Sequence, residues 1–422
     1  SAAGGKRNAE IGFFTKPSHT EIVMTDRMLN TPETEIARRI AALQQILTRK
    51  GLDAALILQK TDLYYFSGTI QQAHLYVPAT GAPVLMVNKV LKRARSESCL
   101  ERIVPLVSPR TIPEILRQSG LALPKRLGLE LDVLPTNLYL SYGGIFSAAE
   151  LVDISTEIRL LRAVKSTYEI ELIREAARYS DRLAAQVPDL LRVGMTEIDL
   201  AGRVEAEARR MGHQGIVRMR LWGSELFYGH LLAGPSGGVA SYLASPTGGT
   251  GVSPAVGQGS SFRQIKRHEP ILVDYVFAYR GYLSDHARIF SLGRLPDELA
   301  AAHAAMLELQ QQIKLMAEPG VPSGSIYDFA LDHATRCGYG EHFMGSGAER
   351  IRFVGHGVGL ELDEFPFLNT GQELELKEGM IIALEPKLIF PLKGVVGIEN
   401  THVVTPQGLE QLGQYPDEIT VV

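Results

Sequence analysis

Cysteine is scarce in this sequence, which contains only Cys99 and Cys337 among its 422 residues. Two cysteines so far apart provide neither a disulfide framework nor a cysteine-based zinc site, and we expect reduced thiols in a cytoplasmic protein. A surplus of positive charge is also lacking, because 43 Lys and Arg residues face 47 Asp and Glu residues, for a formal net charge of −4. This balance argues against a nucleic-acid-binding protein and against a basic protein of membrane surfaces.

Long apolar runs are missing as well. No stretch approaches the run of about 20 apolar residues that a transmembrane helix requires, so no membrane partner is expected. The first five residues, SAAGG, have no apolar centre typical of a secretion signal, and we interpret residues 1–25 as a tail or a cloning scar. The remaining composition, 45% hydrophobic and 21% charged, is ordinary for a globular protein, and the length predicts two or three domains.

Helix and strand signals alternate over residues 26–160, which predicts a smaller α/β domain. Its first helix, which Gly51 ends, has apolar residues at spacings of four, three and four: Ile36, Ile40, Leu43 and Leu47. The apolar stretches Ala54–Leu58 and Tyr64–Phe66 are predicted to be strands. Residues 157–164 are interpreted as a linker or a short strand. We find no catalytic cluster in this domain.

Residues 161–422 are predicted to form a second, larger domain. Ser166 and Glu169 have the spacing of a capping box, which opens a long helix. Small residues dominate the segment 245–261, but neither a Gly-Lys-Ser/Thr motif nor a GxGxxG motif accompanies them. We therefore expect a loop near an active site rather than a phosphate-binding loop.

The stretch 271–290 reads as two strands joined by a turn at Arg280-Gly281, and each strand carries one carboxylate, Asp274 or Asp285. An unpaired carboxylate is costly in a buried strand because its charge is poorly solvated there. Two carboxylates on facing strands are costlier still, unless a cation lies between them. The hairpin therefore predicts a bound cation.

Three further polar residues lie in apolar strands nearer the C-terminus: His356 in GHGVG, Glu385 at the end of MIIALE, and Glu399 in VVGIE. Taken singly, each is explained by a structural role, such as a buried Glu paired with an Arg. Together with the two Asp residues they make four carboxylates and one imidazole, and few cations besides Arg288 and Lys387 are near them in the sequence. A pair of divalent ions satisfies this set better, and its ligand types suit Mn²⁺, Co²⁺, Fe²⁺ or Zn²⁺.

The order of these motifs resembles that of the pita-bread metallopeptidases: an Asp, a second Asp eleven residues later, HGxG, EP, and then GxE. Within that family the chain is most similar to aminopeptidase P and prolidase, which carry a creatinase-like N-terminal domain. The resemblance covers about residues 34–410 and includes GLDAALI and YYFSG near the N-terminus. It implies an α+β fold, in which a smaller creatinase-like α/β domain (26–160) precedes a catalytic pita-bread domain (161–422).

The resemblance also implies roles for the ligands. Asp274 would chelate one metal, Asp285 and Glu399 would bridge both, and His356 and Glu385 would hold the other. Glu385 would in addition shuttle a proton from the activated water to the leaving amine. The implied activity is that of a dinuclear Xaa-Pro aminopeptidase or dipeptidase, with Mn²⁺ as the first candidate metal, a small peptide or small molecule as substrate, and a homodimer as the assembly.

Several positions depart from the family pattern. Asp363 stands where proline-directed members carry a His, and an ionised Asp can only accept a hydrogen bond. Arg352 replaces another His, and Gly397 replaces an Arg. Tyr275 stands where the family has a small residue. We expect Asp363 and Arg352 to take part in catalysis, and His230 and Tyr275 to contact the substrate, in an atypical pocket.

Two other functions fit the same residues. A non-peptidase hydrolase or lyase could act on a small molecule with the same metal site. A pita-bread module that binds without catalysis ranks last, because such modules generally lose the metal ligands and this chain keeps all five.

Overall fold

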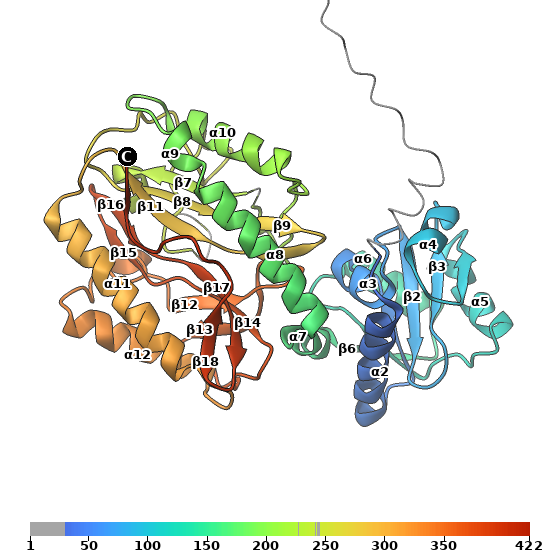
Figure 1. Cartoon of the computed structure of the whole chain (residues 1–422). Coiled ribbons are helices and arrows are strands. Elements are labelled where there is room, and N and C mark those ends of the chain that lie inside the picture. Colours follow the sequence, from blue (N-terminus) through green and yellow to red (C-terminus); the bar gives the residue numbers. More distant parts are fainter. Residues whose placement is uncertain (1–29, 227, 241, 243–244) are drawn as a thin grey trace, which may run out of the picture. The chain divides into compact units, whose positions relative to one another are not determined.

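The computed structural model describes residues 30–226, 228–240, 242 and 245–422 (Figure 1), so the expected tail at 1–25 lies outside the described residues. The chain divides into two compact units, one that ends at Lys125 and one that runs from Arg126 to Val422. The sequence predicted a domain boundary near residue 160 instead. Among the described residues, no helix combines the length and the apolar character needed to cross a bilayer.

The first unit is a small α/β layer. Its four strands have the order β4-β3-β2-β1, in which β3 and β4 are parallel and the other pairs are antiparallel. Its strands are β1 (Ala54–Ile57), β2 (Ala73–Pro78), β3 (Val84–Val87) and β4 (Ile103–Pro105). Its helices are α2 (Glu33–Lys50), α3 (Lys60–Ser67), α4 (Leu91–Glu97), η1 (Pro109–Thr111) and α5 (Ile112–Gln118).

Helix α2 confirms the predicted apolar stripe, because it buries Ile36, Ile40, Leu43 and Leu47 and ends at Gly51 in the left-handed conformation (φ 63°). The predicted strand at Tyr64–Phe66 is wrong, since these residues lie in α3. The side chain of Gln59 accepts hydrogen bonds from the backbone N–H groups of Thr61 and Asp62 and so starts a helix.

The second unit begins with a parallel strand pair, β5 (Arg126–Leu129) and β6 (Glu150–Asp153). The segment predicted as a linker or strand at 157–164 is wrong, because it forms most of helix α7 (Ser155–Ala163). The predicted capping box is confirmed at the start of α8, where Ser166 and Glu169 each bond the other's backbone N–H. The remaining early helices are α6 (Thr136–Ile145), α8 (Thr167–Ala184), α9 (Val187–Leu190) and α10 (Glu197–Arg210).

Two antiparallel-rich sheets dominate the second unit. One has the order β19-β11-β8-β7, and the other has the order β13-β12-β14-β17-β18. The first contains β7 (Gly229–Ala233), β8 (Ile271–Tyr275), β11 (Ala287–Ser291) and β19 (Thr420–Val421). The second contains β12 (Phe353–Gly357), β13 (Glu364–Asn369), β14 (Ile381–Leu384), β17 (Asn400–Thr405) and β18 (Gly408–Gln411).

Two short ribbons connect the strands of these sheets. The predicted turn at Arg280-Gly281 joins β9 (Phe277–Tyr279) to β10 (Tyr282–Ser284), and β15 (Lys387–Phe390) pairs with β16 (Gly394–Gly397). Helix α11 (Asp297–Met316) packs on β16 and β18, while α12 (Ser323–Arg336) packs on β13. Their buried apolar side chains form one core with both sheets, and each fully buried Leu or Ile there stabilises the fold by about 1.5–3 kcal/mol. Short 3₁₀ turns η2 (Gly234–Gly238) and η3 (Gly347–Glu349) complete the unit.

Candidate metal centre and active site

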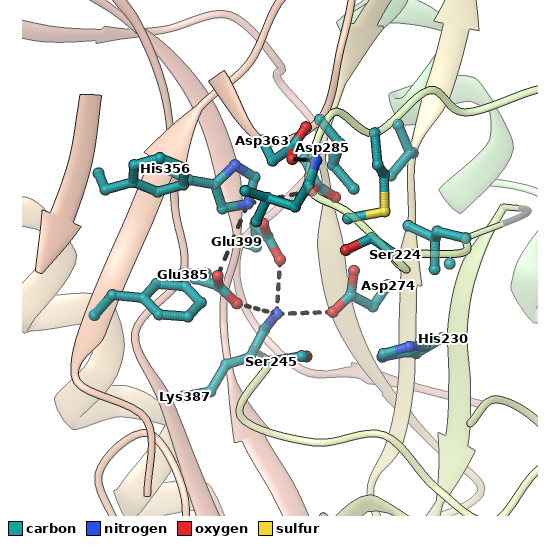
Figure 2. Close-up of a pocket in the computed structure, with 18 of the residues that line it drawn as sticks. Ser224, His230, Ser245, Asp274, Asp285, His356, Asp363, Glu385, Lys387 and Glu399 are labelled. Carbon is teal, nitrogen blue, oxygen red and sulfur yellow. Dashed lines mark hydrogen bonds and ion pairs between the residues drawn. The ribbon is translucent and has the colours of Figure 1, made fainter. Parts of the chain in front are cut away.

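The five residues predicted as metal ligands converge on one side of a cavity of about 300 Å³. Asp274 lies near the end of β8, and Asp285 lies between β10 and β11. His356 lies in β12, Glu385 follows β14, and Glu399 precedes β17. Figure 2 shows these side chains turned toward one another from the two sheets. The sequence spaces them over more than a hundred positions, and the facing sheets bring them together.

Asp285, His356 and Glu399 have the geometry of a metal site. One donor atom from each lies within 4.8 Å of the other two. His356 Nε2 is 3.8 Å from Asp285 Oδ2 and 3.9 Å from Glu385 Oε1. Ligand bonds of about 2.1 Å allow two donor atoms to lie up to about 4.2 Å apart, so one divalent ion fits between His356 Nε2 and the Asp285 carboxylate.

The orientation of His356 suits a metal ligand. Its Nδ1 is 3.2 Å from the carbonyl oxygen of Gly357. A carbonyl can only accept, so Nδ1 carries the proton and donates it, which leaves the Nε2 lone pair directed at the carboxylates. The backbone N–H of Asp285 donates to Thr401 Oγ1 at 2.9 Å and so helps to fix the position of Asp285.

The electrostatics of the cluster favour a cation. Burial and the neighbouring Asp274 carboxylate raise the pKa of Asp285 to about 7. Burial and the Asp285 carboxylate raise the pKa of Glu399 well above its usual range. Both shifts arise because the protein alone poorly compensates these negative charges, and a bound cation would reverse them.

One cation is already present, because the ammonium of Lys387 lies among three of the predicted ligands. Its Nζ donates to Asp274 Oδ2 at 2.7 Å, to Glu399 Oε2 at 2.6 Å and to Glu385 Oε2 at 2.9 Å (Figure 2). From the sequence, Lys387 was expected only to be a cation near the site, and its position among the ligands was not predicted. The signal was there, since residues two apart in an extended segment face the same side, and Lys387 is two residues after Glu385.

His230 and Tyr275 have different positions. His230 lies in β7 opposite Asp274, lines the cavity, and has its Nε2 3.2 Å from Gln258 Oε1. Burial lowers its pKa, so the imidazole is neutral at neutral pH. Tyr275 does not line the cavity, which corrects the predicted substrate contact. It is buried in a hydrophobic cluster on the other side of β8, while the next residue, Val276, reaches the cavity.

Asp363 and Arg352 also differ from the prediction. Asp363 lines the cavity, but its two carboxylate oxygens accept hydrogen bonds from the backbone N–H groups of Arg220 (2.7 Å) and Leu221 (2.6 Å). Its role in the structure is to position the segment that carries Leu221. Arg352 is exposed and is not among the described residues that line the cavity, so the structure places it away from the chemistry.

The rest of the cavity wall was not predicted. It is mostly apolar, and its apolar members are Met219, Leu221, Leu226, Val276, Phe353, Leu362 and Phe367. Four uncharged polar residues join them: Ser224, Ser245, Asn369 and Gln372. Ser245 comes from the segment of small residues that was expected to lie near an active site. Nothing in the local sequence marks the other residues as lining a cavity, because apolar residues in loops and strands are usually predicted to belong to the hydrophobic core.

Comparison with known proteins identifies the family. The model of metallopeptidase family M24 matches residues 171–406, and the model of the creatinase/prolidase N-terminal domain matches residues 39–164. The Xaa-Pro dipeptidase of Pyrococcus furiosus is 26% identical over 90% of this chain and 99% of its own length. A probable dipeptidase, PepE, of Mycobacterium tuberculosis is 28% identical over 92% of this chain and 96% of its own length.

Solved structures show the same fold. The Xaa-Pro dipeptidase from Bacillus anthracis superposes with a TM-score of 0.78 at 23% identity, covering 92% of this chain and all of its own. The X-Pro aminopeptidase from Thermotoga maritima gives a TM-score of 0.75 at 24% identity, covering 88% of this chain and 98% of its own. The predicted pita-bread fold with a creatinase-like N-terminal domain is thereby confirmed. Since its family model spans more than half of the sequence, this chain belongs to metallopeptidase family M24.

Proposed function

We propose that this metallopeptidase is an Xaa-Pro aminopeptidase or dipeptidase with an atypical substrate pocket. The observation that carries the proposal is the convergence of Asp285, His356 and Glu399 on one cavity with the spacing of a metal site. The family and the relatives named as Xaa-Pro dipeptidases support the reaction type.

The site residues divide the work as follows. Asp285, His356 and Glu399 would hold a divalent ion, which supplies Lewis acidity and lowers the pKa of water. Glu385 Oε2 accepts from Lys387, whereas Oε1 faces His356 Nε2. Lys387 thus fixes the rotamer of Glu385 and leaves Oε1 available to take a proton and deliver it to the leaving amine.

The cavity indicates a small substrate. Its apolar wall suits short side chains or a proline ring, and the neutral imidazole of His230 can donate or accept one hydrogen bond. Asp363 cannot donate to the scissile carbonyl oxygen, because it is a carboxylate already bound to two backbone N–H groups. We therefore expect slow turnover of ordinary Xaa-Pro dipeptides.

Several finer assignments belong to the same proposal. Mn²⁺ is the first candidate metal, since the ligand set is rich in oxygen and has one imidazole, with Co²⁺, Zn²⁺ and Fe²⁺ next. The free, exposed thiols of Cys99 and Cys337 suit a cytoplasmic location. The resemblance to aminopeptidase P and prolidase supports a homodimer. A boundary between the two domains near residue 160 is supported by the family models, which meet between residues 164 and 171.

The test is a hydrolysis panel with the purified chain and Mn²⁺, Co²⁺ or Zn²⁺, covering Xaa-Pro dipeptides, matched Xaa-Ala dipeptides and small amides. We expect metal-dependent cleavage of peptides that chelation abolishes and that is lost in Asp285→Asn. A folded, metal-loaded chain that cleaves no peptide would refute the proposal. Cleavage of small amides alone would support the second candidate, a non-peptidase hydrolase or lyase, which the positions of Lys387 and Asp363 favour.

A further inference from the structure

The ammonium of Lys387 lies at a position where the surrounding carboxylates require a cation. Its side chain is buried, with 1% of its surface exposed, and three carboxylates surround its Nζ at 2.6–2.9 Å. Two of those carboxylates, Asp274 and Glu385, contact no other cation at such short distances among the described residues. Three short, charge-assisted hydrogen bonds therefore hold the lysine ammonium in place.

The strand opposite Lys387 leaves no room for a second cationic side chain. Lys387 in β15 pairs directly with Gly397 in β16. Gly397 has a φ of 144°, and a Cβ added there would lie 2.4 Å from the carbonyl oxygen of Pro386 and 2.7 Å from Lys387 Cα. Any side chain at 397, including the Arg that the family pattern led us to expect there, would collide with this backbone. Lys387 is therefore the residue of this strand pair that supplies a cation to the carboxylates.

A second divalent ion does not fit beside this ammonium. An ion held by Asp274, Glu385 and Glu399 would lie about 2.1 Å from their oxygens, within the space that Nζ fills. It would also face a like charge in a buried site. An ion does fit between Asp285 and His356. Lys387 contacts neither residue, and one ion can span the 3.8 Å between Asp285 Oδ2 and His356 Nε2.

We infer that the Lys387 ammonium takes the place of one of the two metal ions, so that the chain binds a single divalent ion at Asp285, His356 and Glu399. Asp274 is then a partner of the lysine and not a metal ligand. The inference depends on the proposed function in one respect, which is that Asp285, His356 and Glu399 bind a metal ion. It narrows the expected two-metal site to one ion and one ammonium.

The consequence for the reaction is a change in charge. Four carboxylates and one ammonium carry a formal charge of −3, which a single divalent ion reduces to −1, whereas two ions on the carboxylates alone would give zero. A substrate with a positively charged group near the scissile bond, such as the free α-amino group of a short peptide, suits that residual negative charge. Asp274, partly exposed and next to the cavity, is the carboxylate that such a group would meet.

The test is the number of ions bound per chain, measured by native mass spectrometry and by elemental analysis after equilibration with Mn²⁺ or Zn²⁺. We expect one ion in the wild type, none in Asp285→Asn, and one in Asp274→Asn with the affinity changed less than about threefold. Lys387→Ala removes the ammonium and opens its space, so we expect two ions. Lys393→Ala is the matched control, because Lys393 follows in the same ribbon but is exposed and paired with Glu298 at 2.8 Å.

Two ions in the wild type, or loss of the ion in Asp274→Asn, would overturn the inference while the proposed function stands. No ion in the wild type with any of the metals would overturn the proposed function itself. One ion in a folded Lys387→Ala would show that the lysine does not stand in for a metal. If Lys387→Ala fails to fold, the wild-type count and the Asp274→Asn count still decide the matter.

Discussion

Removal of the Glu364 carboxylate should destabilise the second unit strongly at neutral pH and much less in acid. Glu364 is buried, and its neighbour Asp363 lines the cavity. It accepts from Arg162 Nη2 at 2.5 Å, from Lys165 Nζ at 3.0 Å, and from the backbone N–H groups of Leu360 (2.9 Å) and Glu361 (3.1 Å). These bonds hold the turn that presents Leu362 and Asp363 to the cavity. We therefore choose Glu364→Gln, which preserves shape and removes the charge.

The magnitude follows from the shifted ionisation of this carboxyl. Burial alone would raise its pKa, but Arg162 and Lys165 outweigh burial and lower the pKa from 4.5 to about 2. A fall of the pKa from 4.5 to about 2 on folding corresponds to about 3 kcal/mol of stability. Because the folded-state pKa is depressed, this contribution is complete above pH 4.5 and disappears as the pH falls toward 2. The substitution also leaves the buried Lys165 ammonium without its carboxylate, which is consistent with a loss of about 3–5 kcal/mol.

The assay is urea unfolding of wild type and Glu364→Gln at pH 7, 5 and 3.5, followed by circular dichroism. We expect a difference of about 3 kcal/mol at pH 7, equivalent to a fall in Tm of about 6 °C, and a smaller difference at pH 3.5. Glu410→Gln is the matched control, since it breaks a more exposed ion pair with Arg174 (2.9 Å) and should cost less than about 1 kcal/mol. If Glu364→Gln costs no more than the control, or the same amount at every pH, the electrostatic argument is refuted.

Three further predictions concern residues that the sequence assigned to the site. Glu399→Gln should lower metal-dependent turnover by about 100-fold or more while the circular dichroism spectrum stays unchanged, because it removes a direct ligand; wild-type turnover would contradict the metal site. Asp363→Asn should cost about 1–3 kcal/mol and raise KM more than it lowers kcat, because an amide N–H would face the backbone N–H of Arg220 or Leu221; a pure loss of kcat would restore Asp363 as a catalytic group. Arg352→Ala should leave kcat/KM within about twofold, as expected for an exposed surface substitution, and steady-state kinetics of the variant checks this.

The residues predicted as metal ligands stood out in the sequence because each is a local anomaly. A carboxylate in an apolar strand conflicts with its surroundings, and Asp274, Asp285 and Glu399 stand out for that reason. The order of these residues along the chain also matched a known family. The structure adds the spatial fact that all five lie around one cavity.

The roles of residues whose partners are distant in the sequence could not be predicted from local sequence patterns. Asp363 binds backbone groups 142 and 143 positions away, and nothing near it in the sequence predicts that contact. Tyr64–Phe66 read as a strand because aromatic residues favour strands, whereas the cap at Gln59 decided for a helix. Tyr275 was assigned to the pocket from its proximity to Asp274, although neighbouring residues in a strand face opposite sides.

The close approach of the two strands at Gly397 makes that position intolerant of side chains, whatever residue stands at 387. A Cβ at 397 would lie 2.4 Å from the carbonyl oxygen of Pro386 and 2.7 Å from the Cα atom of residue 387, and no substitution at 387 removes either atom. The positive φ of 144° adds backbone strain for any residue other than glycine. Gly397→Ala should therefore remain destabilising in a Lys387→Ala background, and the order in which the two changes are introduced should not matter.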